Sequence, residues 1–80
     1  MSLHPKKRSL TLRGHRTSVS IEDRFWAAFC SIARERDLAI NELAALIDET
    51  RDIETEGLAS AIRDSVLRHY MERAADQSRD

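Results

Sequence analysis

The stretch Arg16-Thr17-Ser18-Val19-Ser20-Ile21 decides the fold of this chain. Polar and β-branched residues alternate along it, which predicts a half-buried strand. The next residues complete a capping box, Ser20-Ile21-Glu22-Asp23, with Ser20 as the N-cap and Asp23 at the third helical position. The sequence therefore predicts a strand that leads directly into a helix, and this helix should run to about Arg36.

A second alternating segment precedes this strand. Leu10 and Leu12 alternate with polar residues between Arg8 and Arg13, and after Gly14 the apolar residues fall on the other parity. A change of phase across a glycine indicates a turn or a bulge. Residues 8–13 and 16–21 are therefore expected to form two strand segments, or one strand broken at Gly14-His15.

The remainder of the chain has helical periodicity. Asn41 is the expected N-cap of a second helix that ends near Arg51, residues 52–57 are expected to form a loop, and a third helix should run from Leu58 to about Ala74. The expected buried residues are Phe25, Phe29, Ile32 and Ala33 in the first helix, Leu43, Leu46 and Ile47 in the second, and Leu58, Ala61, Ile62 and Val66 in the third. On the third helix, Leu67, Tyr70 and Met71 lie toward another side, so it is expected to bury two surfaces. We predict a basic flexible arm at residues 1–7, one domain at 8–75 and a disordered tail at 76–80.

Charge is distributed unevenly along the chain. Residues 1–21 contain five Lys and Arg residues and no acid, whereas the remaining 59 residues contain eight Arg and fourteen Asp and Glu. The segments therefore carry about +5 and −6 within a total of −1. A basic N-terminal segment favours a polyanionic partner such as a nucleic acid.

Size and composition exclude several classes of protein. Cys30 is the only cysteine, so no disulfide stabilises this 80-residue chain, and the three histidines lack the spacing of metal ligands. A core of this size needs additional stabilisation, so we expect an obligate homodimer. No apolar run approaches the length of a membrane span, and a single unpaired cysteine fits a cytoplasmic protein. No motif places a catalytic group, so we expect no enzyme, no cofactor and no metal.

The order of the predicted elements resembles that of the ribbon-helix-helix DNA-binding proteins, the family of the methionine repressor and Arc. The resemblance rests on a strand, a capped helix, a short loop and an Asn-capped helix within residues 16–47. A compact bacterial branch of the family also has a Gly-His-Arg-Thr-Ser-Val-Ser run, here residues 14–20, and a closing helix similar to residues 63–70. The resemblance covers about three quarters of the chain, from Arg8 to Tyr70.

This resemblance implies a mainly α-helical homodimer with a short β-strand and an extra C-terminal helix. In the family, one strand from each subunit pairs across a two-fold axis, and the resulting ribbon enters the major groove of DNA. The sequence leaves open whether residues 8–13 or 16–21 form that intersubunit ribbon. If Thr17, Val19 and Ile21 face the core, the opposite face of the strand carries the expected base contacts, which are Arg16, Ser18 and Ser20. The expected contacts to the DNA backbone are Lys6, Lys7, Arg8, Arg13, His15 and Asn41.

Two function hypotheses follow from these features. The first is a dimeric transcriptional regulator, in particular a repressor, that binds double-stranded DNA. The second is an antitoxin-like or adaptor protein whose acidic C-terminal half binds a partner protein. Pairing of Arg13 and Arg16 with acids of the same dimer would favour the second hypothesis, because those cations would then be unavailable to DNA.

Overall fold

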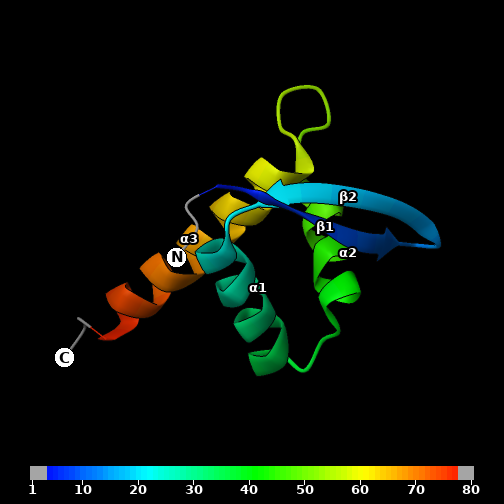
Figure 1. The fold of residues 1–80 in the computed structure, drawn as a ribbon. Helices are drawn as coiled ribbons and strands as arrows, with labels where there is room; N and C mark the ends of the chain where they lie inside the picture. Colours follow the sequence, from blue (N-terminus) through cyan, green and yellow to red (C-terminus); the bar gives the residue numbers. More distant parts are fainter. Residues whose placement is uncertain (1–3, 78–80) are drawn as a thin grey trace.

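The computed structural model describes residues 4–77, which form a two-stranded sheet followed by three helices (Figure 1). The elements are β1 (Lys6–Leu12), β2 (His15–Ile21), α1 (Asp23–Glu35), α2 (Ile40–Thr50) and α3 (Leu58–Gln77). The expectation of a mainly helical fold with a short strand region and an extra C-terminal helix is confirmed. Within these residues, no helix has the length and hydrophobicity needed to cross a membrane.

The two strands form one antiparallel hairpin. Its register runs from Lys6 opposite Ile21 to Leu12 opposite His15. The connecting turn has two residues, Arg13 with φ 51° and Gly14 with φ 83°. Two successive positive φ angles define a type I′ turn, whose twist matches that of the strands it joins, and glycine favours this geometry. The change of phase at Gly14 therefore marks a turn between two paired strands, not a break in a single one.

The boundaries of the predicted arm and tail need correction. Lys6 and Lys7 belong to β1, so the ordered sheet begins two residues before the predicted start at Arg8. At the other end, α3 continues to Gln77, past the predicted end near Ala74. The parts of the predicted arm and tail at 1–3 and 78–80 lie outside the described residues.

The core lies beneath one face of the hairpin. In Figure 1 the hairpin crosses the upper ends of α1 and α2, and α3 runs along the side of the molecule. β1 packs against α2, β2 packs against α3, and α3 also packs against both other helices. The buried side chains are Leu10, Val19, Ile21, Phe29, Ile32, Ala33, Leu43, Ala44, Ile47, Ala61, Ile62 and Val66.

The helices bury most, but not all, of the residues expected from their periodicity. On α2 the buried stripe contains Ala44 at 0% exposure in place of Leu46, which is 43% exposed. The stripe is therefore rotated relative to the prediction, because the small Ala44 allows the close approach of neighbouring elements. On α3 the second apolar surface expected from Leu67, Tyr70 and Met71 is present, but it is exposed in the single chain.

Candidate nucleic-acid interface

The hairpin has two chemically different faces. Side chains alternate between the faces of a strand, so residues 6, 8, 10 and 12 of β1 share a face with 15, 17, 19 and 21 of β2. This inner face includes the buried Leu10, Val19 and Ile21. The outer face consists of three cross-strand pairs, which are Lys7 with Ser20, Ser9 with Ser18, and Thr11 with Arg16. All six of these residues are exposed, and none is acidic.

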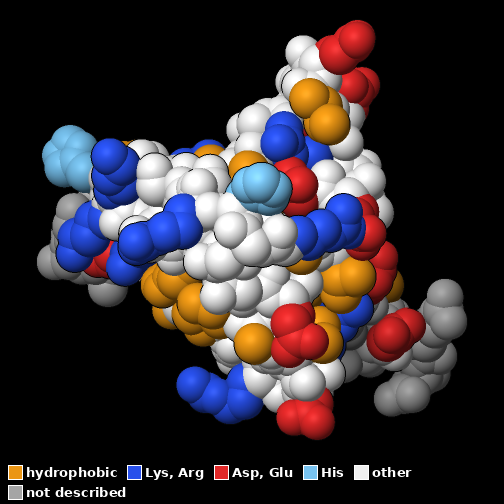
Figure 2. Space-filling model, turned by 90° about the vertical axis from the view of Figure 1, so that its right-hand side faces the viewer, with side chains coloured by type: hydrophobic (Ala, Val, Ile, Leu, Met, Phe, Trp, Pro, Cys, Tyr) orange, Lys and Arg blue, Asp and Glu red, His pale blue; other side chains and the backbone are white. Residues whose placement is uncertain are grey.

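Lys7 and Arg16 are the two cations of this outer face. Neither forms a salt bridge with any carboxylate in residues 4–77. Figure 2 shows basic side chains gathered at the level of the hairpin, above exposed hydrophobic side chains. The outer face therefore presents positive charge together with hydroxyl groups, a combination suited to an anionic, hydrogen-bonding surface.

The inner-face cations Lys6 and Arg8 have a different role. Both form salt bridges with Asp23, the first residue of α1, and the Lys6 ammonium lies 3.2 Å from the carboxylate. The hydrogen bond from Lys6, followed by that from Arg8, holds the pKa of Asp23 below its ordinary value. The Arg8 guanidinium also lies over the Trp26 ring, 5.3 Å from its centroid. These two predicted DNA-backbone residues thus attach β1 to α1.

The turn carries two further residues predicted to contact the DNA backbone. Arg13 forms a salt bridge with Glu49 of α2, which holds the turn against that helix. His15 is exposed directly after the turn. Arg16 makes no such contact, so the pairing that would have favoured the interaction hypothesis is present at Arg13 and absent from Arg16 among the described residues.

Asn41 does not occupy the predicted cap position of α2. The helix begins at Ile40 with Ala39 as its N-cap, and the Ala39 backbone N–H donates to Glu42 Oε1 at 3.0 Å. The Asn41 side chain instead accepts a hydrogen bond of 3.0 Å from the backbone N–H of Thr11. The predicted cap is wrong: this exposed side chain instead bonds to a backbone group at the outer edge of β1.

Ser20 does not act as the predicted N-cap of α1. It is the penultimate residue of β2, and Glu22 occupies the cap position without a side-chain hydrogen bond to the helix. Arg63 of α3 donates to the backbone carbonyl of Ser20 at 3.2 Å and to both carboxylate oxygens of Glu22. The Ser20 hydroxyl is consequently left on the outer face of the hairpin, with no capping role to compete with another contact.

Ser9 and Thr11 belong to the outer face but were not among the predicted site residues. The sequence contained a signal for them, since two alternating segments of similar length flank a glycine, which is typical of a hairpin. Pairing across that turn places residue i opposite residue 27 − i, and so brings Ser9 beside Ser18 and Thr11 beside Arg16. The sequence did not decide between a hairpin and a broken strand. The cross-strand pairing of Ser9 and Thr11 could therefore not be predicted from it.

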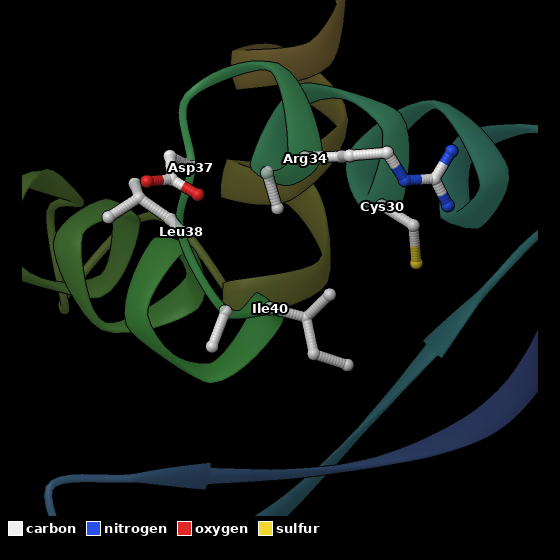
Figure 3. Close-up of a pocket in the computed structure, with 7 residues that line it drawn as sticks. Cys30, Arg34, Asp37, Leu38 and Ile40 are labelled. Carbon is white, nitrogen blue, oxygen red and sulfur yellow. The ribbon is translucent and has the colours of Figure 1, made fainter.

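A shallow cavity lies at the other end of α1, away from the hairpin. Figure 3 shows Cys30 and Arg34 contributed by α1, Asp37 and Leu38 by the connection, and Ile40 by the start of α2. Partial burial raises the pKa of the Cys30 thiol, so it is less readily ionised than an exposed cysteine. Arg34, which also lines the cavity, lowers this pKa by less than burial raises it, so the surroundings do not activate the thiol.

Comparison with known proteins agrees with this architecture. The model of a family described as a ribbon-helix-helix domain matches residues 5–70. The chain belongs to the ribbon-helix-helix family. The searches of the curated proteins and of the solved structures returned no match. Membership of the family supports DNA binding and dimerisation as general properties.

Proposed function

We propose that this ribbon-helix-helix protein is a homodimeric transcriptional regulator that binds double-stranded DNA with the outer face of its hairpin. The observation that carries the proposal is the division of the hairpin into an apolar inner face and an exposed outer face with Lys7, Arg16 and no acid. A two-stranded antiparallel ribbon fits the major groove, where base edges differ in their donors and acceptors. Occupation of the groove would exclude other proteins, so we propose that the protein acts as a repressor in the cytoplasm.

The base contacts are assigned to β2. Arg16 suits guanine, because its guanidinium matches the O6 and N7 acceptors in the major groove. Ser18 and Ser20 follow it at two-residue spacing on the same face, and their hydroxyls can bond to several bases. At the turn, we propose that the exposed His15 contacts the DNA backbone, whereas Arg13 would have to exchange Glu49 for a phosphate to do so.

The hydrogen-bond pattern of the hairpin determines which strand edge is open to a second subunit. In a two-residue hairpin, Leu12 and His15 form a hydrogen-bonded pair, so every second pair along the ladder turns its backbone groups outward. The outward groups belong to Thr11, Ser9 and Lys7 on β1, and to Arg16, Ser18 and Ser20 on β2. On β1 the single outward N–H donor of Thr11 is already bonded to Asn41, whereas on β2 the outward Ser20 carbonyl accepts from Arg63 and keeps a second lone pair for a partner strand.

We therefore propose that two subunits pair through the outer edge of β2, antiparallel and centred on Ser18. This register places Ser18 opposite its own copy and Arg16 opposite Ser20, so that it uses all three outward residues of β2. Thr17 supports this edge, since it lies on the core-facing side of β2 and is nevertheless exposed in the single chain. It lines a groove of about 350 Å³ with Leu12, Ala45 and Leu58, and the same groove contains the polar Arg13, His15, Asp48 and Arg51, so partner side chains of either kind can enter it.

The DNA-binding proposal is tested by Arg16→Ala, with Arg36→Ala as the control of equal charge. Arg36 is an exposed residue at the end of α1 farthest from the hairpin (Figure 1), and it has no salt bridge within the described chain. Binding to duplexes selected from a random pool is measured for both variants. Arg16→Ala should cost about 1–3 kcal/mol at the preferred sequence and relax the preference, as the loss of a base contact does. Equal effects of the two variants would contradict the assignment.

The proposed strand pairing is tested separately by a disulfide. The Cα atoms of a hydrogen-bonded antiparallel pair are about 5.5 Å apart, which a disulfide spans without distortion. Ser18→Cys, introduced together with Cys30→Ser, should therefore form a covalent dimer under mild oxidation. Thr11→Cys in the same background is the control, because β1 lies at the outside of the proposed sheet. Preferential crosslinking of the control would refute this pairing.

A second candidate function rests on the exposed apolar face of α3. Leu67 and Met71 are 56% and 61% exposed, and they line a largely apolar groove together with Ala75. This face and the net charge of −6 after residue 21 favour an antitoxin-like or adaptor role with a partner protein. The replacement of Leu67 and Met71 by Ser should abolish capture of such a partner without affecting DNA binding. If partner capture survives this double replacement, the face is not the binding surface.

A further inference from the structure

We propose that the outer row of β1, formed by Lys7, Ser9 and Thr11, binds the phosphates on both sides of the major groove into which β2 inserts. The proposal rests on DNA binding and on the pairing of two subunits through β2. It assigns the sugar-phosphate contacts to a strand that precedes the ribbon strand, and gives the intrachain hairpin a function beyond stabilising each subunit.

The spacing of strands places β1 over the groove margins. Neighbouring strands lie about 4.8 Å apart, so in a sheet of order β1-β2-β2-β1 each β2 lies roughly 2.4 Å from the two-fold axis and each β1 about 7 Å from it. The major groove is about 12 Å wide, which puts its margins roughly 6 Å from the same axis. Side chains of β2 therefore face base edges, whereas those of β1 face the two phosphate backbones.

The chemistry of the β1 row fits phosphate. Lys7 supplies an ammonium without a salt bridge among the described residues, and Ser9 and Thr11 supply hydroxyl donors. Phosphate oxygens accept hydrogen bonds from ammonium and hydroxyl groups, and such contacts fix the position of a protein on DNA without specifying sequence. None of the three faces a carboxylate across the ladder, because their partners are Ser20, Ser18 and Arg16.

Other candidate phosphate contacts are less available in this structure. Lys6 and Arg8 alternate with the outer row but point to the inner face, where Asp23 neutralises them. At the start of α2, the Asn41 side chain is bonded to Thr11, and the Glu42 carboxylate lies against the Ala39 N–H. A negative charge at this helix start opposes an approaching phosphate, so the outer row of β1 is the better placed donor set.

The decisive experiment compares Lys7→Ala with Lys6→Ala, two adjacent lysines on opposite faces of one strand. The affinity of the full chain for its selected duplex is measured across a salt series. Each phosphate contact contributes nearly one unit to the slope of log K against log salt, so Lys7→Ala should lower the slope by about 1.8 per dimer. Lys6→Ala should leave the slope unchanged, and neither variant should change the preferred sequence. Equal slopes for the two variants, or an unchanged slope for Lys7→Ala, would overturn the proposal.

The hydroxyl contacts have their own test. Ser9→Ala and Thr11→Val preserve the strand and the backbone bond to Asn41, and each should weaken binding about three- to tenfold through the loss of a hydrogen bond. Because these residues carry no charge, the salt slope should remain that of the wild type. A new preferred sequence in either variant would show that the row contacts bases, and this would also overturn the proposal.

These outcomes separate this inference from the proposed function. If the wild type binds no duplex, both fall. If Arg16→Ala relaxes the sequence preference while Lys7→Ala leaves the salt slope unchanged, DNA binding through β2 stands and only the role of β1 is refuted. Circular dichroism of each variant confirms that the fold is retained before binding is compared.

Discussion

The substitution Ile62→Ala measures how far α3 belongs to the core. Ile62 is 0% exposed and packs in the same cluster as Ile21 and Phe29, so its removal leaves a cavity between the hairpin, α1 and α3. Such a truncation costs about 2–5 kcal/mol, and a value near 3 is expected here because three different elements restrict collapse of the cavity. For a domain of this size, a loss of 1 kcal/mol lowers Tm by about 4–8 °C, so Tm should fall by roughly 12–24 °C.

Leu67→Ala is the matched control in the same helix. Leu67 is 56% exposed, so its truncation should change stability by no more than about 0.5 kcal/mol and Tm by only a few degrees. Thermal unfolding followed by circular dichroism at two protein concentrations compares the variants. If Ile62→Ala melts with the wild type, α3 is not part of the core and the reasoning is refuted. A concentration-dependent loss in Leu67→Ala would instead identify the exposed face as a subunit interface.

Three further predictions concern other parts of the fold. Truncation after Gly57 removes Ala61, Ile62 and Val66 from the core. Their burial contributes about 5 kcal/mol, which is similar to the whole free energy of unfolding of a small domain, so the shortened chain should lose its cooperative unfolding transition. Gly14→Ala should lower the free energy of unfolding, measured with denaturant, by about 1–2 kcal/mol, because its backbone φ of +83° is unfavourable for a residue with a Cβ atom. An added Cβ would meet no atom within 4 Å, so the cost comes from backbone strain and not from a steric clash. Acidification should also destabilise the protein, because hydrogen bonding from Arg63 lowers the pKa of Glu22 below its ordinary value of 4.5. The Glu22–Arg63 ion pair therefore contributes fully to folding stability above pH 4.5, and this contribution is lost as the pH falls through the lowered pKa of the folded state. Urea unfolding between neutral pH and about pH 3 should show a shallower loss for Glu22→Gln than for the wild type, and an identical pH dependence would contradict this role of the ion pair.

The sequence predicted the elements better than their termini. Alternation and helical periodicity located the two strand segments and all three helices, since these patterns report directly on which side chains are buried, but they left open whether the segments were two strands or one broken strand. The caps were mispredicted because both residues interact with elements that are distant in sequence. Arg63 donates to the Ser20 carbonyl, and the Asn41 side chain accepts from the backbone of Thr11. Local cap preferences contain no information about such tertiary partners.

The candidate interface was predictable only in part. Alternation predicted that Arg16, Ser18 and Ser20 would share one face, and the hairpin places them there. The charges before Glu22, in contrast, were treated as one basic segment, although the structure divides them between two faces. Lys6 and Arg8 pair with Asp23, whereas Lys7 has no such partner among the described residues. That division depends on the strand register and on a helix start that lies 15 residues from Arg8 in sequence.

The two-residue turn at Arg13 and Gly14 also affects the order of folding and assembly. A ribbon made only of strands from different subunits forms at a rate that depends on protein concentration. Here β2 already has a neighbouring strand two residues away, and hairpins with such short loops form within about 1–10 μs. Newly synthesised chains can therefore pair β1 with β2 before they meet another subunit, which leaves one edge of β2 to be satisfied by association. Strand formation is in this way separated from the diffusional search for a partner, even when the protein is scarce.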